Sequence, residues 1–128
     1  MRVGICDDDS KWYQKAKGII EAYGKEVDIK IDVLYFSQGE NLEVYEGAPL
    51  EAIFMDVDLG EESGIALAGK INKKWKSCQI IYLTNYLSYA TETYHTAHTF
   101  FVLKEQFQDR IGEVFGKILH TIEQKSEN

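Results

Sequence analysis

Acidic side chains follow two of the apolar runs in the sequence. Three consecutive aspartates at 7–9 come directly after the run at 3–6, and Asp56 comes directly after the run at 52–55. Carboxylates that converge without compensation repel one another and raise one another's pKa. A hard divalent cation relieves that repulsion, and Mg²⁺ prefers a few carboxylate oxygens together with water and phosphate oxygens. The pattern therefore indicates a magnesium site, provided that the fold brings the two runs together.

A hydroxyl and an ammonium group follow two further apolar runs, since Thr84 ends the fourth run and Lys104 the fifth. Taken singly, each chemically active residue also has an ordinary structural interpretation. The aspartates at 7–9 could cap a helix, and Asp56 could be a turn residue. Thr84 could bond to the backbone, and Lys104 could be solvated or cap a helix. Their joint occurrence after successive apolar runs favours one shared site.

Five short apolar runs alternate with longer segments whose apolar residues recur at intervals of three and four, which predicts strands and helices in turn. The predicted strands span 3–6, 29–35, 52–55, 79–83 and 99–103, and the predicted helices span 10–23, 37–44, 65–71, 88–95 and 106–124. Five βα units imply a parallel sheet with helices on both faces. Ligands of such a sheet bind at the carboxyl ends of its strands, where the active residues would lie.

Smaller features refine this outline. Ser37 followed by Glu40 fits a capping box at the start of the second helix. Trp12 and Trp75 are interpreted as aromatic residues that lie on helix faces and are buried wholly or in part. The polar tail at 125–128 is either a frayed terminus or the start of a linker.

Composition limits the class of protein. A chain of 128 residues with 45% hydrophobic residues is large enough for one domain with its own core. Its net charge of −7 argues against a sequence-independent nucleic-acid surface. Cys6 and Cys78 lie in apolar stretches, which is typical of buried thiols in a reducing compartment. We expect a cytoplasmic protein with no signal peptide, no transmembrane span and no membrane contact.

These motifs resemble the receiver domain of bacterial two-component response regulators over essentially the whole chain. The acidic residues after the first strand, Asp56 followed eight residues later by Gly64, and the strand ends at Thr84 and Lys104 carry the resemblance. It implies an α/β (βα)5 flavodoxin-like (CheY-like) fold, a doubly wound parallel five-stranded sheet of order 2-1-3-4-5. The segment 82–86, Tyr-Leu-Thr-Asn-Tyr, is most similar to regulators that carry a LytTR-type DNA-binding domain.

The resemblance also implies roles for individual residues. Asp56 would accept a phosphoryl group, Lys104 would pair with a phosphoryl oxygen, and Thr84 would hydrogen-bond another. Phe101 occupies the position of the switch aromatic, although a plain core aromatic is the alternative. The expected ligands of Mg²⁺ are the carboxylates of Asp8 and Asp56 and the backbone carbonyl of Asp58, with Asp7 acting through a water molecule.

The partners follow from the same resemblance. A sensor histidine kinase would donate the phosphoryl group, and the chain would be no enzyme beyond its own phosphotransfer and autodephosphorylation. The receiver would occupy residues 1–124, and the tail at 125–128 would lead to a missing effector domain. DNA would be contacted only through that domain, for transcription regulation. A homodimer would form through the face of the fourth helix, fifth strand and fifth helix.

Three positions depart from the family pattern. Gly60 stands where proline is frequent, Asn85 where alanine or glycine is usual, and Glu105 where a cis proline usually follows the lysine. A cis bond before a residue other than proline costs about 2.5–4 kcal/mol, so we expect Lys104–Glu105 to be trans or visibly strained. The departures leave open a degenerate or stand-alone receiver that acts only as a protein–protein module.

A third hypothesis is a small hydrolase with an aspartyl nucleophile, similar to the haloacid dehalogenases. Asp58 lies two residues after Asp56, as the second aspartate of that family does. The acidic residues after the first strand and the absence of a cap segment argue against this hypothesis.

Overall fold

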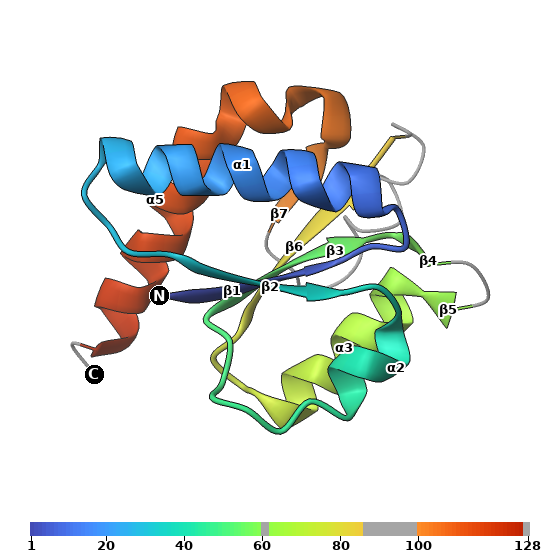
Figure 1. Cartoon of the computed structure of the whole chain (residues 1–128). Helices are drawn as coiled ribbons and strands as arrows, with labels where there is room; N and C mark the ends of the chain where they lie inside the picture. Colours follow the sequence, from blue (N-terminus) through green and yellow to red (C-terminus); the bar gives the residue numbers. More distant parts are fainter. Residues whose placement is uncertain (60–61, 86–99, 127–128) are drawn as a thin grey trace.

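The sheet has five parallel strands in the computed structural model, which describes residues 1–59, 62–85 and 100–126. The strands are β1 (Arg2–Cys6), β2 (Asp32–Phe36), β3 (Ala52–Asp56), β6 (Gln79–Thr84) and β7 (Phe100–Leu103). Their order is β2-β1-β3-β6-β7 (Figure 1). All four neighbouring pairs are parallel. The order 2-1-3-4-5 is therefore confirmed, and β1 and β3 lie side by side as the magnesium hypothesis requires.

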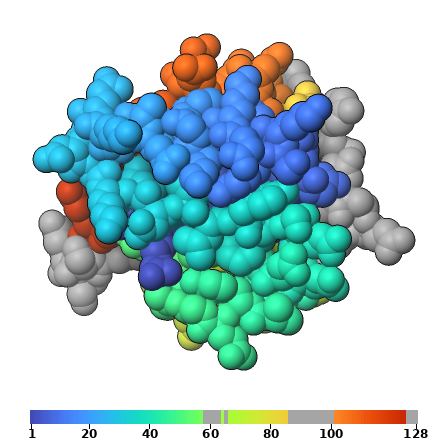
Figure 2. All heavy atoms as spheres, in the orientation of Figure 1, coloured from blue at the N-terminus to red at the C-terminus, as the bar shows by residue number. Residues whose placement is uncertain are grey.

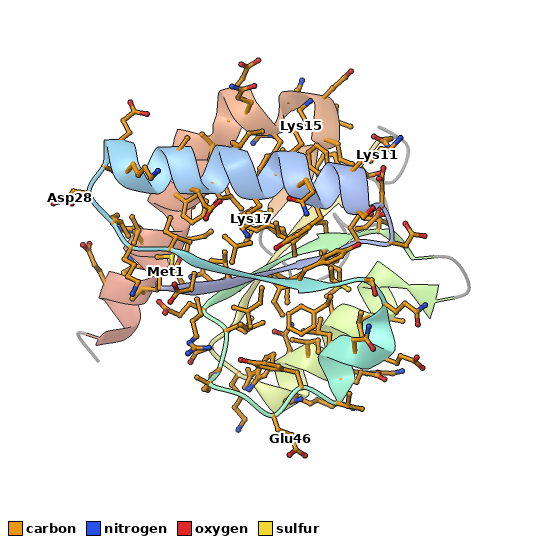
Figure 3. The ribbon with its side chains drawn as sticks, in the orientation of Figure 1. Met1, Lys11, Lys15, Lys17, Asp28 and Glu46 are labelled. Atoms are coloured by element: carbon orange, nitrogen blue, oxygen red, sulfur yellow. The ribbon has the colours of Figure 1, made fainter. Side chains whose placement is uncertain are left out.

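Helices cover both faces of the sheet. The long helices α1 (Ser10–Glu26) and α5 (Phe107–Ser126) lie on one face, and α2 (Gly39–Glu43) and α3 (Gly64–Lys74) lie on the other (Figure 1). On the face of the molecule drawn in Figure 2, the surface of α1 lies above the surface formed by the segment that contains β2 and α2. Lys11 and Lys15 are exposed on α1, whose labelled lysines are drawn in Figure 3. The amphipathic pattern places such lysines on the solvent side.

Alternate residues of the strands enter two separate cores, because successive side chains of a strand point to opposite faces. Ile5 and Phe54 belong to the core beneath α1 and α5. Cys6, Ile53 and Met55 belong to the core against α2 and α3. All five residues of β3 are buried, which explains why its sequence is continuously apolar up to Asp56.

Several element boundaries differ from the prediction. β2 begins at Asp32 and not at residue 29, because the Ile29 N–H donates to the Gly24 carbonyl and prolongs the turn after α1. The capping box is wrong: α2 begins after Gln38, whose side chain makes no capping hydrogen bond. Ser37 Oγ instead accepts a hydrogen bond from the Asn41 side chain at 3.3 Å.

The segment after β3 contains a short antiparallel pair, β4 (Asp58–Leu59) and β5 (Glu62–Ser63), where the sequence predicted only a loop. The predicted helix at 88–95 and the departure at Gly60 lie outside the described residues. Cys6 and Cys78 are both buried, as predicted. Of the helices that the structure describes, none is both long and apolar enough to cross a membrane.

Candidate functional site

Four polar or charged side chains are buried at the carboxyl ends of the strands. In the part of the chain that the structure describes, no other polar or charged side chain is buried. Asp7 follows β1, Asp56 ends β3 and Thr84 ends β6, with exposed fractions of 0%, 8% and 2%. Lys104 follows β7 and is 8% exposed. Burying charge is costly unless the charges are paired. We call these four residues and Asp8 the acidic edge.

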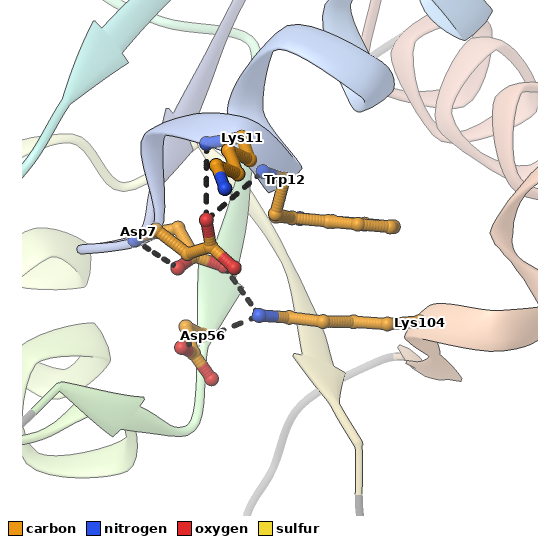
Figure 4. A network of polar contacts seen from close by, with 6 residues as sticks. Asp7, Lys11, Trp12, Asp56 and Lys104 are labelled. Atoms are coloured by element: carbon orange, nitrogen blue, oxygen red, sulfur yellow. Dashed lines mark hydrogen bonds and ion pairs between the residues drawn. The ribbon is translucent and has the colours of Figure 1, made fainter.

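Lys104 joins the two buried carboxylates (Figure 4). Its Nζ donates to Asp7 Oδ2 at 2.6 Å and lies 3.5 Å from Asp56 Oδ2. Burial alone would lower the pKa of Lys104, but the hydrogen bond with Asp7 and the negative charges of Asp56 and Asp7 outweigh it, so its pKa lies above the ordinary value. Lys104 therefore remains a cation between two carboxylates.

The three consecutive aspartates have different roles. Asp9 caps α1, because its Oδ1 accepts from the Lys11 and Trp12 N–H groups at 3.0 and 3.2 Å. Asp7 Oδ1 accepts from the Asp9 N–H at 2.9 Å, so both carboxylate oxygens of Asp7 have partners. Asp8 is exposed. The helix-cap interpretation therefore holds for Asp9, whereas Asp7 and Asp8 belong to the acidic edge.

A metal ion fits the donor set of this edge. One carboxylate oxygen from each of Asp7, Asp8 and Asp56 lies within 4.8 Å of the other two. Hard oxygen donors suit Mg²⁺. Because Lys104 and the Asp9 N–H already occupy the oxygens of Asp7, the donor set favours Asp8 and Asp56 as direct ligands. Asp58, whose carbonyl was the third predicted ligand, lies in β4 two residues after Asp56.

Gly64 explains how the chain passes so close to Asp56. A Cβ atom built on Gly64 would overlap the backbone carbonyl oxygen of Asp56. The Gly64 N–H donates to the Val57 carbonyl at 2.9 Å, which holds the start of α3 against the end of β3. The glycine eight residues after Asp56 is therefore required by this close approach.

Thr84 and Phe101 lie on neighbouring strands, since Thr84 pairs with Leu103 and Tyr82 with Phe101 in the parallel register. Phe101 is half-buried against the core of α2 and α3. This position suits both the switch aromatic and the plain core aromatic, so both interpretations stay open. Glu105 follows Lys104 in a 3₁₀ turn (Lys104–Gln106), and the described residues contain no cis peptide bond, as expected.

Sequence reasoning missed the relation of Trp12 to the site. Its ring centroid lies 5.3 Å from Lys104 Nζ. The position of Trp12 in the first turn of α1, three residues after Asp9, was the available signal. A helical aromatic by itself did not indicate a partner in the turn that follows the fifth strand.

Relatives with similar sequences are regulators. LytR of Staphylococcus epidermidis, a sensory transduction protein, is 35% identical over 79 residues, which are 62% of this chain and 31% of that protein. LytR of Staphylococcus aureus, a transcriptional regulatory protein, is 34% identical over 82 residues, 64% of this chain and 33% of that protein. The chain thus spans about a third of the length of these curated relatives. No protein-family model matches the sequence.

Solved structures with a similar fold include domains of response regulators. The N-terminal domain of a response regulator/sensory box/GGDEF protein from Carboxydothermus hydrogenoformans has a TM-score of 0.82 at 20% identity, covering 98% of this chain and 99% of that one. TrrA of Thermotoga maritima, solved with Mg²⁺ and BeF, has a TM-score of 0.71 at 24% identity, covering 91% and 97%. The chain therefore has the fold of response regulator receiver domains, and over about two thirds of its length its sequence is similar to the LytR proteins.

Proposed function

We propose that the chain accepts a phosphoryl group on Asp56 from a sensor histidine kinase in the cytoplasm. The observation that carries this proposal is the Asp56 carboxylate at the end of β3, 3.5 Å from the Lys104 ammonium and beside Asp8. Asp56 is 8% exposed, so its side chain is not fully enclosed. The ammonium of Lys104 lies beside the carboxylate that would act as the nucleophile.

In the proposed step, an Asp56 oxygen attacks phosphorus and the phosphorus–nitrogen bond of the kinase phosphohistidine breaks. The histidine nitrogen leaves with the bonding electron pair, and Asp56 becomes an acyl phosphate. Lys104 pairs with a phosphoryl oxygen, and the Thr84 hydroxyl donates a hydrogen bond to another. Positioning and charge stabilisation suffice for such a transfer.

Asp8, Asp56 and the Asp58 carbonyl would hold the Mg²⁺ ion, and Asp7 would act through a water molecule. Bound there, the ion supplies positive charge that neutralises the transferring oxygens. The donor set of the acidic edge and the Mg²⁺ and BeF of the TrrA structure support this assignment. Catalysis is confined to the domain's own phosphorylation and autodephosphorylation, and no small phosphate ester is turned over.

Phosphorylation replaces one negative charge with about two. The new phosphoryl oxygens draw the Thr84 side chain inward, and Phe101 turns into the vacated space. The balance between the inactive and active conformations of the face formed by β7 and α5 then shifts. A homodimer forms through that face together with the helix predicted at 88–95. The output is transcription regulation through a LytTR-type DNA-binding domain outside this chain, as the names of the LytR relatives support.

Intact-mass analysis after incubation with acetyl phosphate and Mg²⁺ tests the phosphoacceptor. The expected result is one added phosphoryl group on the wild type and none on Asp56→Asn. Asp58→Asn is the matched control and keeps the adduct, because only the backbone carbonyl of Asp58 is assigned a role. Absence of the adduct on the wild type at saturating donor would end the proposal.

A phosphorylation-independent interaction module is the second candidate. Glu105, which stands where the family usually has a proline, favours it. Partner binding by Asp56→Ala separates the two functions. Binding equal to that of the phosphorylated wild type supports the module, and binding equal to that of the unphosphorylated wild type supports the switch.

A further inference from the structure

Trp12 lies against the lysine of the acidic edge although it comes from a different part of the chain. Its ring runs alongside the Lys104 side chain in Figure 4, and the ring centroid is 5.3 Å from Nζ. A cation this close to an indole face is attracted by the negative potential of the ring. The attraction is largest where water is excluded, and both residues are buried.

A second contact attaches Trp12 to the chain just after Lys104. The rings of Trp12 and Phe107 meet edge to face, with centroids 5.5 Å apart. Phe107 begins α5 directly after the 3₁₀ turn that contains Lys104. Trp12 therefore touches the ammonium group and the residue three positions further along, so it contacts both ends of the segment that carries the lysine.

The indole N–H of Trp12, unlike its ring, makes no favourable contact of this kind. Its indole Nε1 is buried and has no hydrogen-bond partner among the described residues. A buried N–H without a partner destabilises the fold, and phenylalanine or leucine at this place would carry no such group. The observed contacts of the indole are those with Lys104 and Phe107.

We infer that Trp12 is a positioning residue that holds the Lys104 ammonium against Asp7 and Asp56, ready for a phosphoryl oxygen. The inference rests on the proposed function and extends it. Lys104 stands at the start of a 3₁₀ turn after β7. The aromatic face of Trp12 limits the movement of the Lys104 side chain there.

The rate of phosphorylation by acetyl phosphate at saturating Mg²⁺ measures this role. Trp12→Leu, which keeps an apolar side chain but no ring, is expected to slow the reaction by about tenfold. Trp12→Phe keeps a ring face and is expected to retain most of the rate. Trp75→Leu is the matched control, since Trp75 lies over Lys74 with its centroid 4.9 Å from Nζ, away from the acidic edge. It is expected to react at the wild-type rate.

The same substitution in a Lys104→Met background shows whether Trp12 acts through the lysine. Trp12→Leu is then expected to have no additional effect on the rate. An equal slowing with and without Lys104, or a wild-type rate for Trp12→Leu, would overturn the inference. Thermal unfolding of each variant confirms that the folded protein is compared.

Calorimetric titration with Mg²⁺ alone gives a reading that does not depend on phosphorylation. If Trp12 holds the ammonium beside the carboxylates, Trp12→Leu lets it move away and raises the Mg²⁺ affinity toward that of Lys104→Met. Unchanged or weaker Mg²⁺ binding in Trp12→Leu would contradict the positioning role. If the wild type took up no phosphoryl group, the proposed function would be wrong. The Mg²⁺ titration would still show whether Trp12 holds Lys104 beside the carboxylates.

Discussion

Two lysines of this domain each lie against a tryptophan, in surroundings that differ completely. At the acidic edge, Lys104 is buried between the carboxylates of Asp7 and Asp56, with Trp12 over it. At the second place, the exposed Lys74 lies over Trp75 and donates to the backbone carbonyls of Glu43 (2.8 Å) and Tyr45. We call residues Glu43, Tyr45, Lys74 and Trp75 the α2–α3 corner.

The two regions differ in how the charge of the lysine is stabilised. A buried ammonium without opposite charge would lose its proton, so Lys104 depends on two carboxylates and they depend on it. An exposed ammonium is stabilised by water and can bond neutral carbonyls, so Lys74 only ties the end of α2 to α3. The same pair of residue types therefore builds a charged site in one region and a packing contact in the other.

Removing the charge of each lysine in turn should give the largest difference in stability between the two regions. Lys104→Met leaves two carboxylates without their cation, so the free energy of unfolding at neutral pH without divalent ions is expected to fall by about 3–5 kcal/mol. Lys74→Met, the matched control, loses exposed hydrogen bonds and is expected to cost about 1 kcal/mol. Urea denaturation measures both. Equal losses would show that the acidic edge does not depend on its lysine.

A methyl group added at two glycines of α3 separates the regions in another way. Gly64→Ala pushes a Cβ into the Asp56 carbonyl, so stability is expected to fall by about 3 kcal/mol and phosphorylation to slow. Gly69→Ala meets no atom within 4 Å and should stabilise the helix by about 0.5–1 kcal/mol. Thermal unfolding of the two variants is the measurement, and a stable Gly64→Ala with normal phosphorylation would contradict the close-packed geometry.

Two neighbouring aspartates should behave differently although both lie beside the acidic edge. Asp9→Ala removes the cap of α1 and is expected to cost about 1 kcal/mol. Asp8→Ala removes an exposed carboxylate that repels Asp7 and Asp56, so stability should stay within about 0.5 kcal/mol of the wild type or rise. Asp8→Ala should also weaken Mg²⁺ binding, whereas Asp9→Ala should preserve it. Chemical denaturation and Mg²⁺ titration test the pair, and weaker Mg²⁺ binding in Asp9→Ala alone would reverse these roles.

The smallest effect is confined to alkaline pH. The pKa of Lys104 is raised in the folded state above its ordinary value of 10.5, despite the opposing effect of burial. Its ion pairs therefore stabilise the fold fully below pH 10.5, and this contribution is lost as the pH rises through the raised pKa. The stability difference between wild type and Lys104→Met should shrink across that window. If the stability difference between wild type and Lys104→Met stayed constant across this pH range, the pKa of Lys104 would not lie within it.

The strands of the sheet and the residues of the acidic edge were predictable from the pattern of apolar runs, and the order of the strands followed from the resemblance to receiver domains. Each run is followed by its active residue, and parallel strands bring those residues to one edge. Burial on both faces made the strand that ends at Asp56 the clearest prediction. The geometry of the separate aspartates was not predictable, since neighbouring residues of one type can cap a helix or enter a site.

What the sequence could not predict depends on contacts between distant segments. The capping box at Ser37 failed because a local pattern does not decide where α2 begins once Phe36 and Leu42 are packed in the core. The contact of Trp12 with Lys104 joins residues 92 positions apart and follows only from the packing of α1 against α5. The hairpin of β4 and β5 arises from backbone pairing that no apolar pattern marks.

Chemical trapping of the acyl phosphate tests the central claim most directly. Borohydride reduces an aspartyl phosphate to homoserine and releases phosphate, and peptide mapping then locates the changed residue. After reaction with acetyl phosphate and Mg²⁺, the account predicts homoserine at position 56 and unchanged aspartate at positions 7, 8 and 58. Homoserine at one of those other positions, or at none of the four, would contradict the assignment of Asp56 as the phosphoacceptor.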